Sequence, residues 1–313
     1  MNCSTRAVNS FETVNAERKK DNGWVPHFGI TANINDHNRV YFRYAEDLRY
    51  PSMFESTVGF SASTSQYPLK PEHAYNWELA FVSDLTPWLP EAEFADVKLA
   101  YYHHLTRDVI DRDNYFRFEN IDKQIISGIE FTARYDSGRF FTDFGVNSTF
   151  KNEVCDENTA AILSMQSMSL AKTDPIPQCM KYGFPNSYLL TQATPEFSAN
   201  WSVGGRFLEN KLELGSRITY YQKYKNKDLD WYASHAYNPD NPGVGNYLYF
   251  YNIPFSWGET LLVDAYANYQ VTERLTMELV GTNLTDQYYV DPATRSAMAA
   301  PGRTVKLSLT ARF

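Results

Sequence analysis

Two cysteines of this chain lie close enough in sequence to form a disulfide bond. Cys155 and Cys179 are 24 positions apart in a proline-containing stretch without a strand pattern. Closing a loop of that length would remove roughly 3 kcal/mol of chain entropy from the unfolded state. Oxidising compartments permit such a bond, whereas a reducing one leaves two free thiols. We therefore expect a Cys155–Cys179 bridge if the stretch lies outside the cell, with free thiols as the alternative. Cys3 lacks a lipidation context.

The acidic residues do not form a recognisable catalytic or metal-binding set. Asp84 with Glu91, and Asp228 with Asp230, are close pairs without motif spacing. Residues 111–114 supply oxygen ligands, but they lack the glycine and terminal glutamate of a calcium loop. The sequence also has no phosphate-binding glycine loop and no nucleophile elbow. We expect no enzyme activity, no metal site and no intrinsic cofactor.

The elements that would position any site are strands. The last nine residues, Val305 to Phe313, alternate apolar and polar side chains, and the chain stops on an aromatic residue. Such a strand is amphipathic across its two faces, and at a chain end it must be held by pairing. This is how the closing strand of an outer-membrane barrel is built, so we expect Phe313 to act as a C-terminal signal for barrel assembly.

The same period of two recurs upstream, and no stretch shows a sustained helical period. Together with the last strand, eleven segments have it: Phe28–Ile34, Val40–Tyr44, Tyr75–Phe81, Ala95–Leu105, Ile129–Tyr135, Thr142–Phe150, Phe197–Phe207, Leu212–Tyr220, Leu261–Val271, Leu275–Gly281 and Val305–Phe313. The pattern predicts an all-β, antiparallel protein.

The connections between these segments alternate between short and long. The long ones are Asp47–Ala74, Thr106–Gln124, Lys151–Pro195, Gln222–Glu259 and Thr285–Gly302, and a stretch of intermediate length, Leu85–Glu93, is among the others. Antiparallel strands place alternate connections at opposite ends of the sheet, so one end has tight turns and the other has large loops. Outer-membrane barrels have this asymmetry, whereas a soluble sandwich, the alternative, has no reason for it.

Composition agrees with a barrel. The 313 residues include 16% aromatics, which a barrel uses where its wall meets the lipid headgroups. No apolar run approaches the roughly 18 residues of a membrane-spanning helix. The net charge of −8 and the scattered basic residues exclude a nucleic-acid surface.

Two features predict that the chain is part of a larger barrel. Single-chain bacterial barrels have an even number of strands, and eleven segments are found here, unless one strand is miscounted. Residues 1–23 are polar and lack the apolar core of a secretory signal. We expect residues 1–23 to lie outside the barrel and residues 24–313 to form part of its wall.

Two regions resemble the TonB-dependent outer-membrane receptors. Arg43–Glu55, followed by Leu69–Glu72 and Asn76–Glu78, resembles a strand, an Arg-aromatic-Pro loop start and a Leu-Lys-Pro-Glu run of that family. Gly281–Tyr289 resembles its Asn-Leu-(Thr/Phe)-Asp-x-x-Tyr motif, and Pro301–Arg303 resembles the loop before its final strand. The resemblance covers about residues 24–313.

The resemblance implies a 22-stranded barrel of which this chain is the C-terminal half, without signal peptide or plug domain. It implies active uptake of an iron complex, namely haem, a haem-protein or a ferric siderophore, energised by the TonB complex through the missing plug. The expected partners are outer-membrane lipid, the barrel-assembly machinery, the TonB complex and the iron-complex ligand, with no nucleic acid. A half-barrel alone would leave two edges unpaired in lipid. A passive pore or a barrel enzyme is the alternative.

Within this family resemblance, candidate ligand-binding residues are those of the long loops. Imidazole is a good ligand for haem iron, although no histidine falls between Tyr50 and Leu69, where haem receptors of the family commonly carry one. Aromatic residues with polar tips suit recognition of a flat or protein ligand, and equally suit a self-packed loop. The candidates are His73, His104, His235, Arg49, Tyr50, Trp231 and Tyr232.

Overall fold

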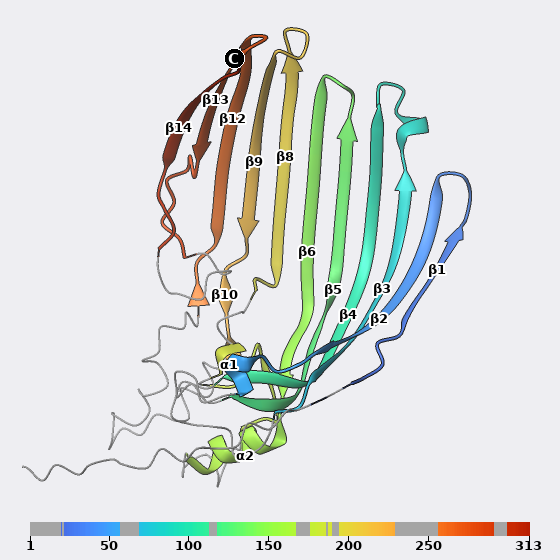
Figure 1. The fold of residues 1–313 in the computed structure, drawn as a ribbon, viewed down its shortest axis with the longest axis vertical. Helices are drawn as coiled ribbons and strands as arrows, with labels where there is room; N and C mark the ends of the chain where they lie inside the picture. The colour runs from blue at the N-terminus through green and yellow to red at the C-terminus, as the bar shows by residue number, and fades with distance from the viewer. Residues whose placement is uncertain are drawn as a thin grey trace, which may run out of the picture.

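The computed structural model describes residues 20, 22–56, 69–112, 118–166, 176–185, 187–189, 194–228, 256–290 and 299–313. Eleven strands follow one another in the main sheet (Figure 1): β1 (His27–Asn33), β2 (Asn38–Arg49), β3 (Glu72–Asp84), β4 (Phe94–Arg112), β5 (Phe118–Asp136), β6 (Phe140–Cys155), β8 (Phe197–Phe207), β9 (Leu212–Tyr221), β12 (Thr260–Thr272), β13 (Leu275–Thr282) and β14 (Thr304–Ala311). They correspond to the eleven predicted strands, and the predicted all-β, antiparallel architecture is confirmed.

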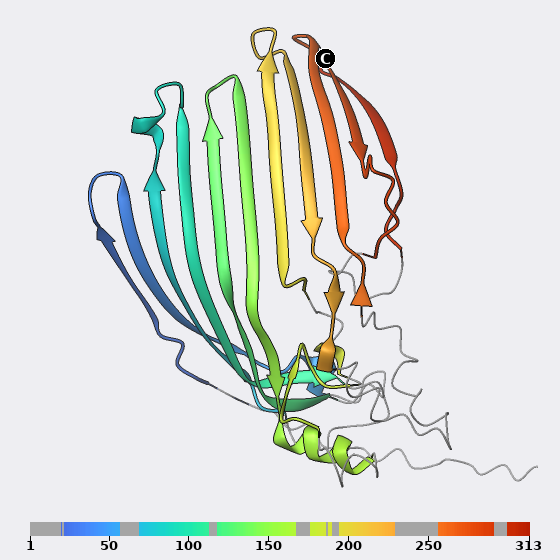
Figure 2. The same cartoon turned by 180° about the vertical axis from the view of Figure 1, so that it is seen from behind.

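Each strand pairs antiparallel with its neighbours in chain order, from β1 at one edge to β14 at the other. Both views show the C-terminus and the tight turns gathered at one end, hereafter the short-turn end, and the wider connections at the opposite long-loop end (Figures 1 and 2). Among the described residues the sheet is open, because β1 and β14 are not paired with each other.

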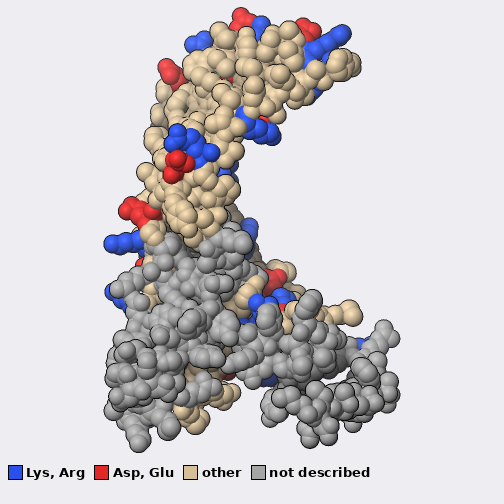
Figure 3. Space-filling view, turned by 90° about the vertical axis from the view of Figure 1, so that its left-hand side faces the viewer, with Lys and Arg blue, Asp and Glu red and all other residues tan. Residues whose placement is uncertain are grey.

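The two faces of this sheet differ in chemistry. On the outer face, apolar side chains lie opposite each other on neighbouring strands. Examples are the register pairs Phe42–Leu79, Leu99–Phe131 and Leu279–Leu307. Many of these side chains are exposed: Leu79 is 47%, Leu99 48% and Leu307 61% accessible. Figure 3 shows the sheet from its side as a curved wall with a hollow face. Ion pairs such as Lys98–Glu78, at 2.7 Å, belong to the opposite, polar face.

The long central strands correct one predicted loop. Thr106–Gln124 was expected to be a long connection, but β4 extends to Arg112 and β5 begins at Phe118. Their pairing continues to Arg112–Phe118. Val109, Ile110 and Asp111 are all buried, so this end of β4 is covered on both faces. A doubly covered strand loses the alternation that a sequence pattern detects.

Short elements that the sequence pattern did not predict connect or extend the strands. They are α1 (Met53–Ser56), the 3-10 helix η1 (Thr86–Trp88), α2 (Glu157–Gln166), β7 (Cys179–Lys181), which pairs with β6, and the separate pair β10 (Tyr224–Lys225) and β11 (Ser256–Trp257). Within the described part of the chain, no helix has the length and apolar character needed to cross a membrane. Residues 1–19 and 21 lie outside the described residues, so the assignment of residues 1–23 stays a prediction.

Candidate ligand-binding site

A small hydrophobic core lies at the long-loop end, beyond the regular wall. Val109 of β4, Ile121 of β5 and Val154 of β6 pack in it with side chains of α2 and of the segment that carries β7. Met180, Tyr182 and Phe184 are fully buried there. The described part of the loop between β6 and β8 is therefore folded onto the strand ends. It forms a platform, which consists of α2 and residues 176–185 and 187–189.

Asp111 fastens this platform to β4. Its carboxylate accepts hydrogen bonds from the hydroxyl of Ser187 and from the backbone N–H of Leu189, the latter at 3.2 Å. Burial raises the pKa of Asp111 to about 6, and these hydrogen bonds to the charged form oppose the rise. Asp111 is 5% exposed, so these hydrogen bonds are shielded from solvent.

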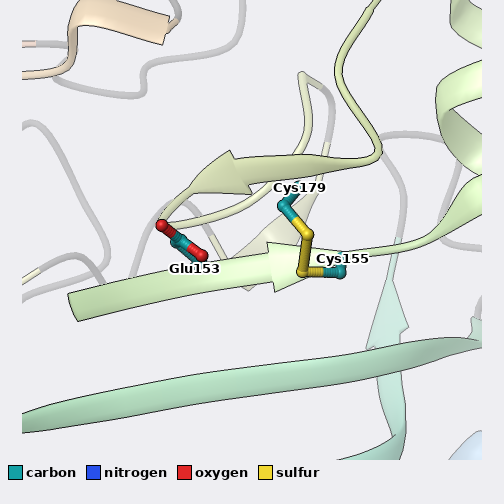
Figure 4. Close-up of side chains that lie close together, drawn as sticks. All are labelled: Glu153, Cys155 and Cys179. Atoms are coloured by element: carbon teal, nitrogen blue, oxygen red, sulfur yellow. A yellow bond between two sulfur atoms is a disulfide. The ribbon is translucent and has the colours of Figure 1, made fainter.

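The two loop cysteines form a disulfide in the structure, with an S–S distance of 2.07 Å (Figure 4). Cys155 ends β6, and Cys179 begins β7 directly opposite it. Glu153 lies beside the bridge, with its ligand atom within 4.8 Å of both sulfur atoms. Because both sulfurs are bonded to each other, neither offers a thiolate to a metal ion.

A second long loop is anchored to the same platform where it leaves β9. The backbone N–H of Lys181 donates to Asp228 at 2.7 Å, and the side-chain amide of Asn226 donates to the carbonyl of Lys181 at 3.0 Å. The rings of Tyr182 and Tyr224 meet edge to face with centroids 5.0 Å apart. Burial raises the pKa of Tyr182 to about 12. The loops after β6 and β9 thus share one base.

Arg49, a predicted ligand residue, joins three segments of the chain. Its guanidinium donates to Glu72 at 2.6 and 2.8 Å and to Glu55 of α1 at 2.9 and 3.0 Å. The hydrogen bond to Glu72, which outweighs the effect of burial, raises the pKa of Arg49 above its usual value. Tyr50, the next candidate, is 43% exposed. Arg49 therefore holds the start of the β2–β3 loop against β3.

His73 faces the outer side of the wall with both ring nitrogens occupied. Nε2 donates to Glu46 at 2.7 Å, and the hydroxyl of Tyr75 donates to Nδ1 at 3.0 Å. The imidazole also stacks on Tyr75, with ring centroids 4.3 Å apart. In this arrangement no lone pair remains for an iron atom, and the side chain points away from the polar face.

His104 has the opposite placement. It lies on the polar face, where Nδ1 donates to Asn76 Oδ1 at 2.7 Å, so the lone pair resides on Nε2. The residue lines a hollow of about 590 Å³, whose other lining residues include Tyr102, Ile126, Pro195 and Tyr221. The preceding residue, His103, is on the outer face beside Trp77, with ring centroids 5.5 Å apart. The wall therefore separates two adjacent imidazoles.

The remaining candidates, Trp231, Tyr232 and His235, lie outside the described residues. The structure brings together contacts that the sequence did not reveal, above all Asp111 with Ser187. The 111–114 stretch was noted for its oxygen atoms, but no local spacing marks a carboxyl whose partner lies 76 positions away.

An amphipathic antiparallel wall with tight turns at one end and wide loops at the other defines a class, the outer-membrane β-barrels. The sequence then gives the family, since residues 4–284 match the model of the TonB-dependent receptor-like β-barrel. The chain belongs to this family, whose members are receptors of the outer membrane rather than enzymes.

Two curated relatives are similar to the chain over most of its length. It is 45% identical over 312 residues to the hemophilin receptor of Acinetobacter baumannii, covering 98% of this chain and 29% of the relative. It is 24% identical to a probable TonB-dependent receptor of Haemophilus influenzae, over 88% of this chain and 32% of that protein. The chain thus spans about a third of these relatives' length.

The solved structures share the fold. The FrpB iron transporter of Neisseria meningitidis superposes with a TM-score of 0.62 at 18% identity, covering 92% of this chain and 39% of the transporter. The siderophore receptor PirA of Acinetobacter baumannii gives 0.60 at 16% identity, over 93% and 41%.

Proposed function

We propose that this chain is part of the barrel wall of a receptor that takes up an iron complex by TonB-dependent transport. The observation that carries the proposal is the similarity to the hemophilin receptor, which runs through nearly the whole chain. The two-faced wall is consistent with it, since an apolar outer face fits lipid and a polar inner face fits a passage for a hydrophilic cargo. Iron is the cargo of this transport and not a resident cofactor.

Among iron complexes, we favour a protein ligand of the hemophilin type, and hence haem as the cargo. The platform supports this choice, because a protein ligand needs a broad, preformed surface. Two long loops share a base that is packed around Tyr182 and Phe184 and tied by the Cys155–Cys179 bridge. Ferric siderophores are the second candidate, favoured by the fold shared with siderophore receptors.

The receptor would have three further partners. The TonB complex would act through the plug domain of the receptor, and membrane lipid would cover the exposed apolar face. The barrel-assembly machinery would read the C-terminal strand. Phe313 is fully exposed at the end of this strand, which leaves the aromatic side chain accessible to such a partner.

The test is growth on a single iron source. The receptor that contains this chain is expressed in a strain that lacks its own receptors for haem and siderophores, with and without TonB. We expect hemophilin-bound haem to support growth only when TonB is present. Growth on a ferric siderophore alone would show that the ligand is a siderophore and not a protein of the hemophilin type. Uptake without TonB would show that the barrel is a passive pore and not an active transporter.

A further inference from the structure

The outer face of the wall carries two basic side chains directly opposite each other near the long-loop end. Arg107 of β4 and Lys123 of β5 are register partners, and both are exposed. Like charges at such a pair destabilise a sheet unless an anion lies between them. Among the described residues, no carboxylate makes an ion pair with either one.

The carboxylates around this pair are already engaged. Four of them have other partners: Glu46 binds His73 at 2.7 Å, Glu153 binds Lys151 at 3.0 Å, Asp108 binds Lys70 at 3.3 Å, and Asp122 accepts the backbone N–H of Glu157 at 3.4 Å. None of these carboxylates makes an ion pair with Arg107 or Lys123, so the two cations have no direct counter-ion among the described residues.

The position of Arg107 and Lys123 along the membrane normal indicates which anion they could bind. The part of β4 from Phe94, at the short-turn end, to Leu105 is about 36 Å long at about 3.3 Å per residue. Because barrel strands are tilted by about 40°, this length corresponds to about 28 Å along the membrane normal. The apolar band of such barrels is about 25 Å tall. Arg107 and Lys123 thus lie immediately beyond the hydrocarbon, at the level of the lipid headgroups.

The row beneath the pair supports this placement. Tyr75, Leu105 and Ile125 are consecutive register partners on the same outer face. The guanidinium of Arg107 lies 5.9 Å from the centre of the Tyr75 ring. An aromatic and two aliphatic side chains below two cations match a molecule with an acyl chain below a phosphate.

We propose that Arg107 and Lys123 form a binding site for the phosphorylated headgroup of a lipid in the outer leaflet. The acyl chains of that lipid would lie on Leu105 and Ile125. The site is on the lipid side of the wall, so it is separate from the transport route and does not depend on which iron complex is carried.

The test uses the intact receptor in detergent and compares Arg107→Gln/Lys123→Gln with wild type. The probe is bisphosphorylated lipid A, and dephosphorylated lipid A and inorganic phosphate serve as comparisons. We expect wild type to bind the phosphorylated glycolipid at least about tenfold more tightly than the variant, with an affinity that falls as salt rises. Lys211→Gln, which removes one positive charge at the short-turn end, should bind as wild type does.

Thermal unfolding gives a readout that a purely structural role would not produce. Without lipid, the double variant should be as stable as wild type or more so, because the like-charge repulsion is gone. With lipid A, wild type should gain more in melting temperature than the variant. Equal binding by wild type and variant, equal binding of the dephosphorylated glycolipid, or displacement of lipid A by millimolar inorganic phosphate would each overturn the proposal.

Discussion

Asp111 and Ser187, 76 positions apart in the chain, meet in a buried hydrogen bond that holds the platform to β4. Ser187 donates its hydroxyl to the carboxylate, and Leu189 donates its backbone N–H to the same group. Burial raises the pKa of Asp111 from 3.8 to about 6, so this carboxyl binds a proton more tightly in the folded platform than in the unfolded chain.

The first prediction concerns pH. A carboxyl whose pKa is higher in the folded state favours folding at low pH, so platform stability should fall as pH rises from about 4 to 6 and then stay constant. Asp111→Asn keeps an acceptor and cannot ionise, so its platform should be pH-independent over this range. Hydrogen exchange of residues 176–185 and 187–189 between pH 4 and 8 measures the stability of the platform. An unchanged pH profile in the variant would contradict it.

The second prediction concerns the disulfide. Replacing Cys155 and Cys179 by serine should lower the stability of the platform by about 3 kcal/mol, because the open loop regains entropy in its unfolded form. Limited proteolysis should then cut α2 and residues 176–178 faster, while the strands of the wall stay protected. Cys3→Ser is the matched control. Equal cleavage rates in all variants would show that the core, and not the bond, holds the platform.

The third prediction concerns Arg49. Arg49→Ala should free α1 from β3 and speed hydrogen exchange of Met53–Ser56 several-fold, because Glu55 and Glu72 lose their shared partner. Arg49→Lys should restore only part of the protection, since an ammonium cannot bind two carboxylates through a planar fork. Arg39→Ala, at the other end of β2, should leave α1 unchanged. If Arg49→Lys protected α1 from hydrogen exchange as fully as wild type, the positive charge of Arg49 and not its planar fork would hold α1.

The fourth prediction compares two adjacent histidines, and it rests on haem being the cargo. His104→Ala removes an imidazole whose Nε2 lone pair is left unused on the polar face, so haem transferred to the receptor should show an altered absorption spectrum and weaker retention. His103→Ala should have no effect, because that ring lies on the outer face beside Trp77. Identical spectra for both variants would exclude His104 as an iron ligand. The proposed transport function, which the growth test examines, would not be affected by that result.

The wall strands could be predicted because each has an apolar outer side and a polar inner side. Leu79 and Leu99 face outward while Glu78 and Lys98 face inward, and this contrast repeats every second residue along the chain. Loop asymmetry could be predicted for the same reason, since alternating strand direction assigns each connection to one end. The extra length of β4 escaped prediction because Val109, Ile110 and Asp111 are all buried.

The sequence by itself determined that the chain forms an amphipathic antiparallel wall, because the period of two is local and needs no knowledge of distant partners. Only the tertiary structure decided which polar groups meet. Asp111 finds Ser187, Arg107 opposes Lys123, and His73 and His104 turn to opposite faces, since such encounters follow from strand register and from how the loops pack. Register is fixed by the sum of many weak contacts across the sheet, and no single stretch of sequence contains that sum.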